Sequence, residues 1–431
     1  MKAYPKYKNS GIEWLGEIPE HWEVKKVKFC AIINQKTLAE STPSNFEFDY
    51  VDISNVNLEA GVIGSERYLF GKAPSRARRK VKSGDVILST VRTYLKAIAT
   101  INKNQENYIV STGFCVISPM RNLFDTVFFS YFLKSEYFIE TVSSISTGVS
   151  YPATNANDIA NLITLLPSLS EQRAIANYLD RETQKIDHLI AKQERLISLL
   201  EEKRQAIISH TVTKGLDSNA KMKKSGVKWL GEIPEHWEMK KLKYLFSIKK
   251  RIAKKLGYEV LSITQKGLKV KDISSNEGQL SMDYSKYQLV FPGDFAMNQM
   301  DLLTGSVDIS RFTGVTSPDY RVFCLVDKES TPLYYKYLLL RGYLDRIFFN
   351  FGQGSSHLGR WRLPREQFLD FILPYPSKFE QKKIASKIET FIESSQKIVT
   401  KIQSAIELLK EKRTALISAA VTGKIDVRES A

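Results

Sequence analysis

A stretch of nineteen residues near the start of the sequence occurs a second time in its middle. Residues 10–28 read SGIEWLGEIPEHWEVKKVK, and residues 225–243 read SGVKWLGEIPEHWEMKKLK, with four changes, three of them between apolar residues. Such a repeat constrains the fold before any local motif does, because both copies must specify the same structural unit. The sequence therefore predicts an internal duplication, two copies of one unit.

Shorter matches place the rest of the second copy 209 residues after the first, whereas the opening stretch repeats after 215. These matches are Gly84-Asp85 with Gly293-Asp294, Phe114-Cys115-Val116 with Phe323-Cys324-Leu325, and Glu171-Gln172 with Glu380-Gln381. Between the matches the copies differ almost completely: one continues VILSTVRTYLKAIA after its Gly-Asp pair, the other FAMNQMDLLTGSVDIS. The ends of the two copies are nearly identical, whereas their middle parts differ. This pattern favours one fold used twice for two targets over an old duplication whose copies diverged freely.

Each copy ends in a segment patterned as a long helix. Apolar residues recur there with alternating three- and four-residue spacing, at Leu179, Ile186, Leu189, Leu196, Leu200 and Ile207, and at Ile384, Ile388, Phe391, Ile398, Ile402, Ala405, Leu409 and Leu416. This spacing is typical of a coiled-coil seam. Neither segment contains proline or glycine, and a helix of roughly 40 residues is about 60 Å long at 1.5 Å per residue. Two matching helices favour pairing with each other; binding of a separate partner is the alternative.

Charge and composition narrow the class of protein. The 63 basic and 47 acidic residues give a net charge of +16, which suits an anionic partner such as nucleic acid. The two helical segments carry +1 and +4, so +11 remains for the rest, mostly the globular parts. Cys30, Cys115 and Cys324 are too scattered for a disulfide framework or a zinc site. With a polar start and only short apolar stretches, the sequence indicates a cytoplasmic protein without a membrane segment.

The motifs, taken in order, resemble the specificity subunit of type I restriction-modification systems. They are the SG-x-x-WLGEIPEHWE opening, the EQ-x-x-IA that begins each helix, and the LL-x-EKR-x-A-x-IS-x-x-VT that ends it, all present twice. The resemblance covers essentially the whole chain. It implies a mixed α/β fold with a pseudo-twofold repeat: target recognition domains at 1–168 and 215–377, and spacer helices at 169–214 and 378–424 that pair as an antiparallel coiled coil.

The resemblance also implies a function. Each recognition domain would read one half of a bipartite, asymmetric site in double-stranded DNA, and the helices would set the gap. The implied partners are two methylation subunits, which modify adenine, and two restriction and translocation subunits. The chain itself would be non-catalytic and hold no cofactor or metal, since S-adenosylmethionine, ATP and magnesium are expected on the partners.

Candidate DNA contacts in the first copy fall into three groups. A basic run before the Gly84-Asp85 turn would neutralise phosphates, and a group after an apolar strand would place a guanidinium near guanine O6 and N7. A third group lies in the loop STGVSYPATNAN, whose amides suit adenine. The basic run is Arg76, Arg78, Arg79 and Lys80. The group after the strand is Arg92, Tyr94 and Lys96, and the loop group is Tyr151, Asn155 and Asn157. A solvated basic face and a plain connector are the alternatives.

In the second copy the strongest candidate is the segment FGQGSSHLGRWR, residues 351–362. Its candidates are Gln353, Ser355, Ser356, His357, Arg360 and Arg362, with Gln299 a weaker one after the Gly293-Asp294 turn. His21 and His236 recur beside tryptophans, but a segment shared by both copies cannot distinguish two half-sites. We therefore expect these histidines to pack or dock rather than catalyse.

Motifs of enzymes are incomplete. Glu23-Val24-Lys25 and Glu238-Met239-Lys240 resemble the E-x-K of metal-dependent nucleases, but the first aspartate of the sequence is Asp49, so none precedes Glu23 to help hold a metal in the usual order. Ser317-Pro318-Asp319-Tyr320 lacks the second proline of adenine methyltransferases, and no phosphate-binding G-x-x-x-x-G-K-[ST] is present. A stand-alone nuclease and a coiled-coil scaffold that does not bind DNA remain the alternatives.

Overall fold

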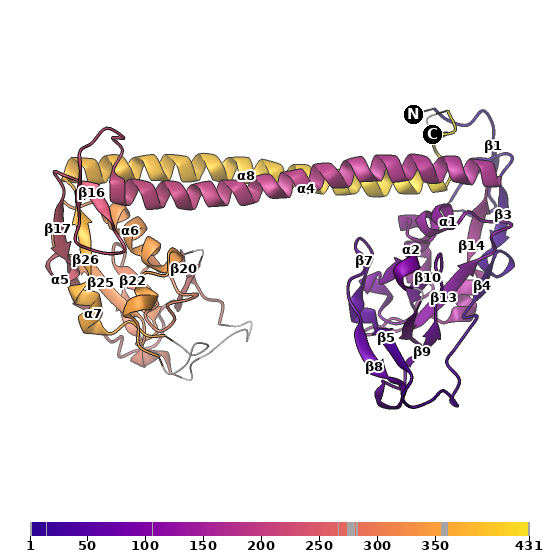
Figure 1. The fold of residues 1–431 in the computed structure, drawn as a ribbon, viewed down its shortest axis with the longest axis horizontal. Coiled ribbons are helices and arrows are strands. Elements are labelled where there is room, and N and C mark those ends of the chain that lie inside the picture. The colour runs from indigo at the N-terminus through magenta and orange to yellow at the C-terminus, as the bar shows by residue number, and fades with distance from the viewer. Residues whose placement is uncertain are drawn as a thin grey trace. The chain divides into compact units, whose positions relative to one another are not determined.

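The computed structural model describes residues 2–13, 15–105, 107–265, 267–273, 281, 283–354 and 361–429. Ser355, Ser356, His357 and Arg360, four of the candidates of the second copy, lie outside the described residues. The chain forms two compact units (Figure 1). Unit 1 comprises Met1–Gln193 with Ser404–Ala431, and unit 2 comprises Glu194–Gln403. Each unit therefore contains one globular part together with a portion of both long helices.

Unit 1 contains a four-stranded antiparallel sheet that is buried on both faces. Val86, Leu88 and Cys115 pack into a core shared with the helices, whereas Ile87 and Val116 pack into a second core on the opposite face. Burial on both faces explains why these strands read as continuous apolar runs. Its strands, in sheet order, are β11 (Ile98–Thr100), β10 (Val86–Ser89), β13 (Phe114–Pro119) and β4 (Ala31–Ile33).

The other elements of unit 1 surround this sheet. A second sheet, in the order β8-β5-β12-β9, pairs β5 with β12 in parallel and its other neighbours antiparallel. The elements are β8 (Glu66–Leu69), β5 (Glu47–Val51), β12 (Tyr108–Ser111) and β9 (Ala77–Lys80); the pairs β1 (Tyr7–Asn9) with β2 (Glu17–Pro19), β3 (Glu23–Lys26) with β14 (Ile163–Leu166) and β6 (Val56–Asn57) with β7 (Gly61–Val62); and helices α1 (Thr126–Leu133), α2 (Glu136–Ser144) and α3 (Ala156–Asn161).

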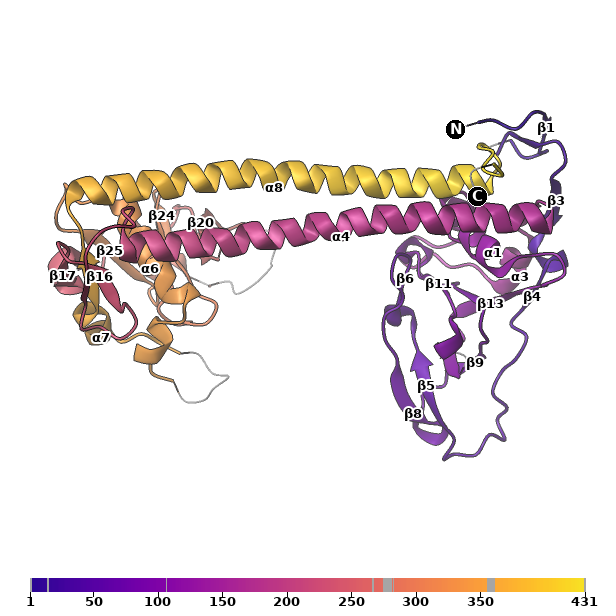
Figure 2. The same ribbon diagram turned by 45° about the horizontal axis from the view of Figure 1, so that its top comes forward.

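Unit 2 repeats the central sheet in the same strand order, β23-β22-β25-β18, of which Figure 2 labels β25. Its elements are β18 (Phe246–Lys249), β22 (Phe295–Met297), β23 (Val307–Ile309) and β25 (Arg321–Leu325); the pairs β15 (Met222–Lys224) with β16 (Glu232–Pro234), β17 (Glu238–Lys241) with β26 (Ile372–Tyr375), β19 (Leu261–Thr264) with β20 (Gly267–Val270) and β21 (Gln288–Val290) with β24 (Gly314–Thr316); and helices α5 (Leu242–Leu245), α6 (Pro332–Leu344) and α7 (Arg365–Asp370).

The strand registers correct one detail of the sequence comparison. Leu88 pairs with Ile98 and Met297 with Val307, which keeps the 209-residue offset. Leu88 also pairs with Cys115, however, whereas Met297 pairs with Arg321, 206 residues after Cys115. The match of Phe114-Cys115-Val116 with Phe323-Cys324-Leu325 at one uniform offset is therefore wrong for the structure. Because apolar residues replace one another readily in a buried strand, the two strand sequences still look alike when they are aligned three residues out of register.

The long helices are α4 (Leu169–Lys214) and α8 (Lys378–Val421). Each is followed by a glycine with positive φ, Gly215 at 80° and Gly423 at 73°, a conformation that ends helices. Within unit 1, Ile186 of α4 shares a core with Leu416 of α8. Within unit 2, residues of both helices again share one core, Ile208 and Val212 with Ile384 and Ile388.

The predicted seam is wrong at several positions. Leu189, Leu196 and Ile398 are 46%, 44% and 46% exposed, whereas the neighbours Ile190 and Ile197 are half-buried. The ends of both helices pack into the globular cores as well as near each other, and a helix of 3.6 residues per turn drifts from a strict heptad. Within the part of the chain that the structure describes, no helix combines the length and the apolar character needed to cross a bilayer.

Candidate nucleic-acid interface

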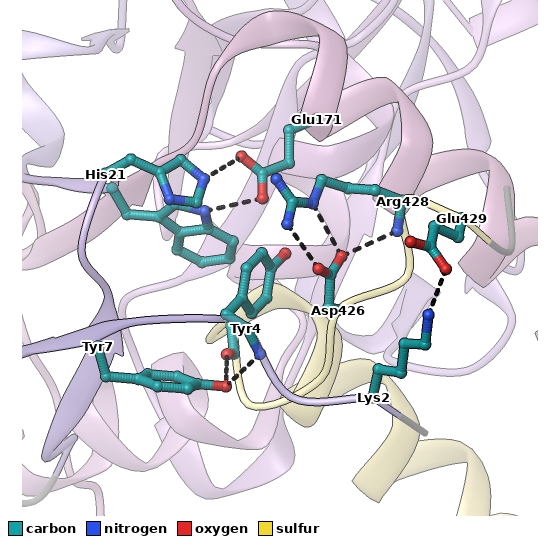
Figure 3. A network of polar contacts seen from close by, with 10 residues as sticks. Lys2, Tyr4, Tyr7, His21, Glu171, Asp426, Arg428 and Glu429 are labelled. Atoms are coloured by element: carbon teal, nitrogen blue, oxygen red, sulfur yellow. Dashed lines mark hydrogen bonds and ion pairs between the residues drawn. The ribbon is translucent and has the colours of Figure 1, made fainter.

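The repeated histidine and tryptophan hold the first turn of each long helix. Nε2 of His21 lies 2.9 Å from the Glu171 carboxylate, and Nε1 of Trp22 donates to the same carboxylate at 3.1 Å (Figure 3). In unit 2, His236 and Trp237 contact Glu380 at 2.8 and 3.1 Å. Both tryptophans are fully buried. Each histidine thus anchors the opening segment to the helix through a hydrogen bond while its side chain stays 46% (His21) or 59% (His236) exposed, and docking of a partner stays a prediction.

A buried glutamine next to each glutamate fastens the helix to its globular part. Oε1 of Gln172 accepts a hydrogen bond from the Asp125 amide at 2.8 Å, at the start of α1, and Nε2 donates to two carbonyls, those of Leu123 and Pro167, each at 2.9 Å. Gln381 accepts from the Thr331 amide at 3.0 Å and donates to Pro376 at 3.1 Å. Sequence reasoning noted this Glu-Gln pair only as a motif and missed its function as a clamp.

In unit 1 the residues after α8 lie along the N-terminal residues (Figure 3). The Asp426 amide donates to the Lys2 carbonyl at 2.9 Å, Lys2 pairs with Glu429 at 2.6 Å, and the Arg428 guanidinium lies over the Tyr4 ring at 5.0 Å. Burial raises the pKa of Tyr4 far above its ordinary value. These contacts fix the end of α8 within unit 1.

Two loops of unit 1 meet beyond the end of β10. The Thr154 amide donates to the Thr90 carbonyl at 2.8 Å, and the Thr93 amide donates to the Pro152 carbonyl at 3.3 Å. The guanidinium of Arg92 consequently lies 4.9 Å from the ring centroid of Tyr151. The structure thus brings together two groups that the sequence placed nearly sixty residues apart. We call these loops, residues 90–96 and 147–155, the recognition loops of unit 1.

The other candidates of unit 1 divide by exposure. Tyr94, Lys96 and Asn157 are exposed beside or within the recognition loops. Asn155 is also exposed, but its side chain caps α3: Oδ1 accepts from the amides of residues 157 and 158, and Nδ2 donates to Asp158 at 2.6 Å. The expected adenine-pairing amide of Asn155 is therefore already engaged, because an asparagine before a helix is used as its N-cap.

Strand β9 divides the basic run. Arg76 and Lys80 are exposed, whereas Arg78 and Arg79 are half-buried. Arg78 lies 4.6 Å from the Phe70 ring centroid and donates to the Ala77 carbonyl at 2.9 Å. Burial lowers the pKa of Arg79. The Arg76 carbonyl accepts from Thr112, whose neighbour Gly113 accepts from Thr90, so the run adjoins the recognition loops at Arg76.

Unit 2 has an equivalent pair of loop segments beyond β22: residues 298–306, and the described residues 352–354 with 361–363. The Leu363 amide donates to the Gln299 carbonyl at 2.9 Å, and Gln353 pairs with Arg362 through two backbone hydrogen bonds. The side chains of Gln353 and Arg362 are exposed. Gln299, in contrast, is 8% exposed and its Nε2 donates to the Asp319 carbonyl at 2.9 Å. The side chain of Gln299 therefore faces the interior and not a bound base.

Arg321 is a buried cation beneath the loops of unit 2. It is 5% exposed, donates to the Leu363 carbonyl at 3.0 Å and lies 4.4 Å from the Phe368 ring centroid. Burial lowers the pKa of Arg321 to about 10, so the side chain stays charged at neutral pH. Sequence reasoning missed Arg321 because a single arginine within a strand carries no motif. Among the described residues, no group of His, Cys, Asp and Glu is arranged to hold a metal ion.

The two α/β units share one design. Each has a loop pair at one end of its sheet and a long helix anchored by a Glu-Gln pair, which defines a protein with two similar binding modules. Residues 19–197 and 234–408 each match the family model described as the type I restriction modification DNA specificity domain. The chain belongs to this family and is a DNA specificity subunit of the type I restriction class.

Individual relatives agree with this assignment. The chain is 26% identical to the type I restriction enzyme MjaVIII specificity subunit of Methanocaldococcus jannaschii, over 95% of this chain and 94% of that protein. A structure from work on complex assembly and conformational transition of the type I R-M system has a TM-score of 0.71 at 19% identity, covering 95% and 99% of the two chains. The HsdS subunit of Thermoanaerobacter tengcongensis has a TM-score of 0.54 at 20% identity, covering 95% and 98%. These similarities do not favour a stand-alone nuclease or a scaffold.

Proposed function

We propose that each unit reads one half of a bipartite, asymmetric site in double-stranded DNA through its loop pair. The observation that carries this proposal is the same strand order in both units, β11-β10-β13-β4 and β23-β22-β25-β18, with unlike loops at the same place. Identical frames position the loops alike, while unlike side chains read different bases. Two different half-sites make the whole site asymmetric.

The proposed contacts are of two kinds. Arg76, Lys80 and Lys96 are exposed cations that bind phosphates, whereas Arg92 in unit 1 and Gln353 and Arg362 in unit 2 are exposed side chains able to hydrogen-bond to base edges. Arg78 and Arg79, half-buried in β9, support the strand that carries Lys80. Ser355, Ser356, His357 and Arg360 belong to the same proposal through their position between Gln353 and Arg362 in the sequence.

The long helices are proposed to pair as an antiparallel coiled coil that acts as the spacer. The start of α4 shares a core with the end of α8 in unit 1, and the end of α4 shares a core with the start of α8 in unit 2. An ion pair between Asp187 and Arg413 at 2.9 Å adds a polar contact between the helices in unit 1. This order of contacts supports an antiparallel arrangement of the two helices.

The chain is proposed to be non-catalytic and to act in the cytoplasm. Two methylation subunits, carrying S-adenosylmethionine, would modify adenine within the site, and two restriction subunits, using ATP and magnesium, would translocate and cut DNA. This chain would hold none of these cofactors and would direct the other subunits to the DNA site. DNA cleavage by the purified chain with magnesium, without other subunits, would contradict this division of labour.

Exchange of one recognition domain tests the proposal. Residues 31–168 would be replaced by the equivalent region of a relative, and the chimera produced with its methylation subunits in a host without other adenine methylation. Mapping of methylated adenines should show one half-site changed and the other kept. The matched chimera replaces the corresponding part of unit 2 and should change the other half. If one exchange altered both half-sites, the units would not be independent readers.

A further inference from the structure

Four large apolar or aromatic side chains lie exposed on the recognition loops of unit 1. Tyr94 and Leu95 are 55% and 50% exposed on the first loop, and Val149 and Tyr151 are 102% and 66% exposed on the second. Single exposed apolar residues are common, but several gathered on two adjoining loops mark an interaction site. The aromatic rings were noted in the sequence, whereas Leu95 and Val149 were not.

The loops that present these side chains are held in place. Besides the backbone bonds between them, Oγ1 of Thr93 donates to Oγ of Ser146 at 2.9 Å, and Oγ1 of Thr90 donates to the Gly113 carbonyl at 2.9 Å. Arg92 and Lys96, on either side of the short turn that carries Tyr94 and Leu95, have φ values of 50° and 51°. Residues other than glycine adopt this strained conformation mostly where the surrounding structure enforces it, often at functional sites.

The charges around the apolar group suit a polyanion. Arg92 is exposed and stacks on Tyr151, which orients the guanidinium while leaving its N–H groups free to donate at the edge. Within the described part of the chain, Arg92 and Lys96 form no ion pair. The nearby Asp158 carboxylate is engaged by Asn155 at 2.6 Å. The two adjoining loops thus present exposed apolar groups together with cations that form no ion pair within the described residues.

We propose that Leu95 and Val149 read the C5-methyl group of thymine in the half-site of unit 1. This inference rests on the proposed function of unit 1 as a DNA reader. In the major groove the thymine C5-methyl group is the apolar feature of a base edge that apolar side chains contact. Arg92, beside these residues, contacts a neighbouring guanine in the same groove. The half-site therefore contains a thymine, on either strand, whose methyl group contributes to binding.

Replacement of thymine by deoxyuridine tests this inference, because it removes only the methyl group. The half-site of unit 1 is first identified by the domain exchange described above. Equilibrium binding of the complex with its methylation subunits is then measured on DNA in which each thymine of that half-site is replaced in turn. At one position, deoxyuridine should weaken binding about three- to fivefold, the effect of burying one methyl group.

Variants assign the effect to the loops. Val149→Ala and Leu95→Ala should bind thymine DNA more weakly and should lose most of the difference between thymine and deoxyuridine, as a double-mutant cycle requires. Ile63→Ala is the matched control, because Ile63 is 60% exposed in unit 1 but outside the recognition loops. This control should keep the full difference.

Several results would overturn the inference while leaving the proposed function intact. They are a half-site without thymine, equal binding of thymine and deoxyuridine DNA by the wild type, and loop variants that keep the full methyl effect. Loss of assembly with the methylation subunits in Val149→Ala, with DNA binding by the chain unchanged, would instead assign the apolar residues to a protein contact. Absence of any sequence-specific binding by the wild-type complex would overturn the proposed function itself.

Discussion

Gln172 combines full burial with three hydrogen bonds to the backbone of unit 1. Gln172→Leu would leave one amide and two carbonyls without these partners, and each unsatisfied buried group is costly. We expect a loss of roughly 2–4 kcal/mol in the free energy of unfolding of unit 1, measured by urea denaturation. Gln205→Leu, at an exposed position of α4, is the control and should change little. Equal midpoints for the two variants would contradict the role of Gln172 as a clamp.

Glu380 gives unit 2 a pH dependence. Burial acts to raise the pKa of Glu380, but hydrogen bonds from His236, Trp237 and Ser377 together outweigh burial and lower it. Because the folded state favours the charged carboxylate, this stabilisation is present above the ordinary glutamate pKa and is lost as pH falls through the lowered pKa. Glu380→Gln should therefore destabilise unit 2 at pH 7 and progressively less towards pH 3.

Hydrogen exchange of unit 2 amides, compared between the wild type and Glu380→Gln across this pH range, measures the difference. Glu393→Gln, on an exposed position of α8, is the control for loss of a carboxylate on the same helix. A difference that stays constant from pH 7 to pH 3 would show that the charge of Glu380 is not what holds the opening segment.

At the scale of elements, the face of α4 that packs can be tested with two adjacent residues. Ile190 packs against the core of unit 1, whereas Leu189 is 46% exposed. Ile190→Ala should lower the free energy of unfolding by about 1–2 kcal/mol, and Leu189→Ala by less than about 0.5 kcal/mol, in urea denaturation. A larger loss of stability in Leu189→Ala than in Ile190→Ala would instead support the heptad expected from the sequence, in which Leu189 belongs to the seam.

At the scale of the whole molecule, the helices are proposed to set the gap between half-sites. Insertion of four residues, about one helical turn, near Glu201 lengthens α4 by about 6 Å, close to two base pairs at 3.4 Å each. We expect the unspecified gap to grow by one or two base pairs with both half-sites unchanged, as read by mapping methylated adenines. Glu201→Gln without the insertion should leave the site as it is. Altered half-sites would refute the spacer role.

The sequence by itself determined the features that occur twice. The duplication, the two long helices and the family follow from repeated motifs, because an uninterrupted helix needs only local signals: a periodic apolar face, no internal proline or glycine, and a glycine at its end. The expectation that His21 and His236 pack or dock a partner, and do not read bases, also came from the repeat, since a segment common to both copies cannot distinguish two targets. The divergent strands were predicted less well, because apolar runs buried on both faces carry no period that fixes their register.

Only the tertiary structure decided which residues meet. Arg92 and Tyr151 stand nearly sixty residues apart, and their contact depends on hydrogen bonds between two loops that no local pattern specifies. The same holds for the inward turn of Gln299 and the shift of the seam from Leu189 to Ile190. Each of these is set by long-range packing, which competes with local propensity and, at these positions, outweighs it.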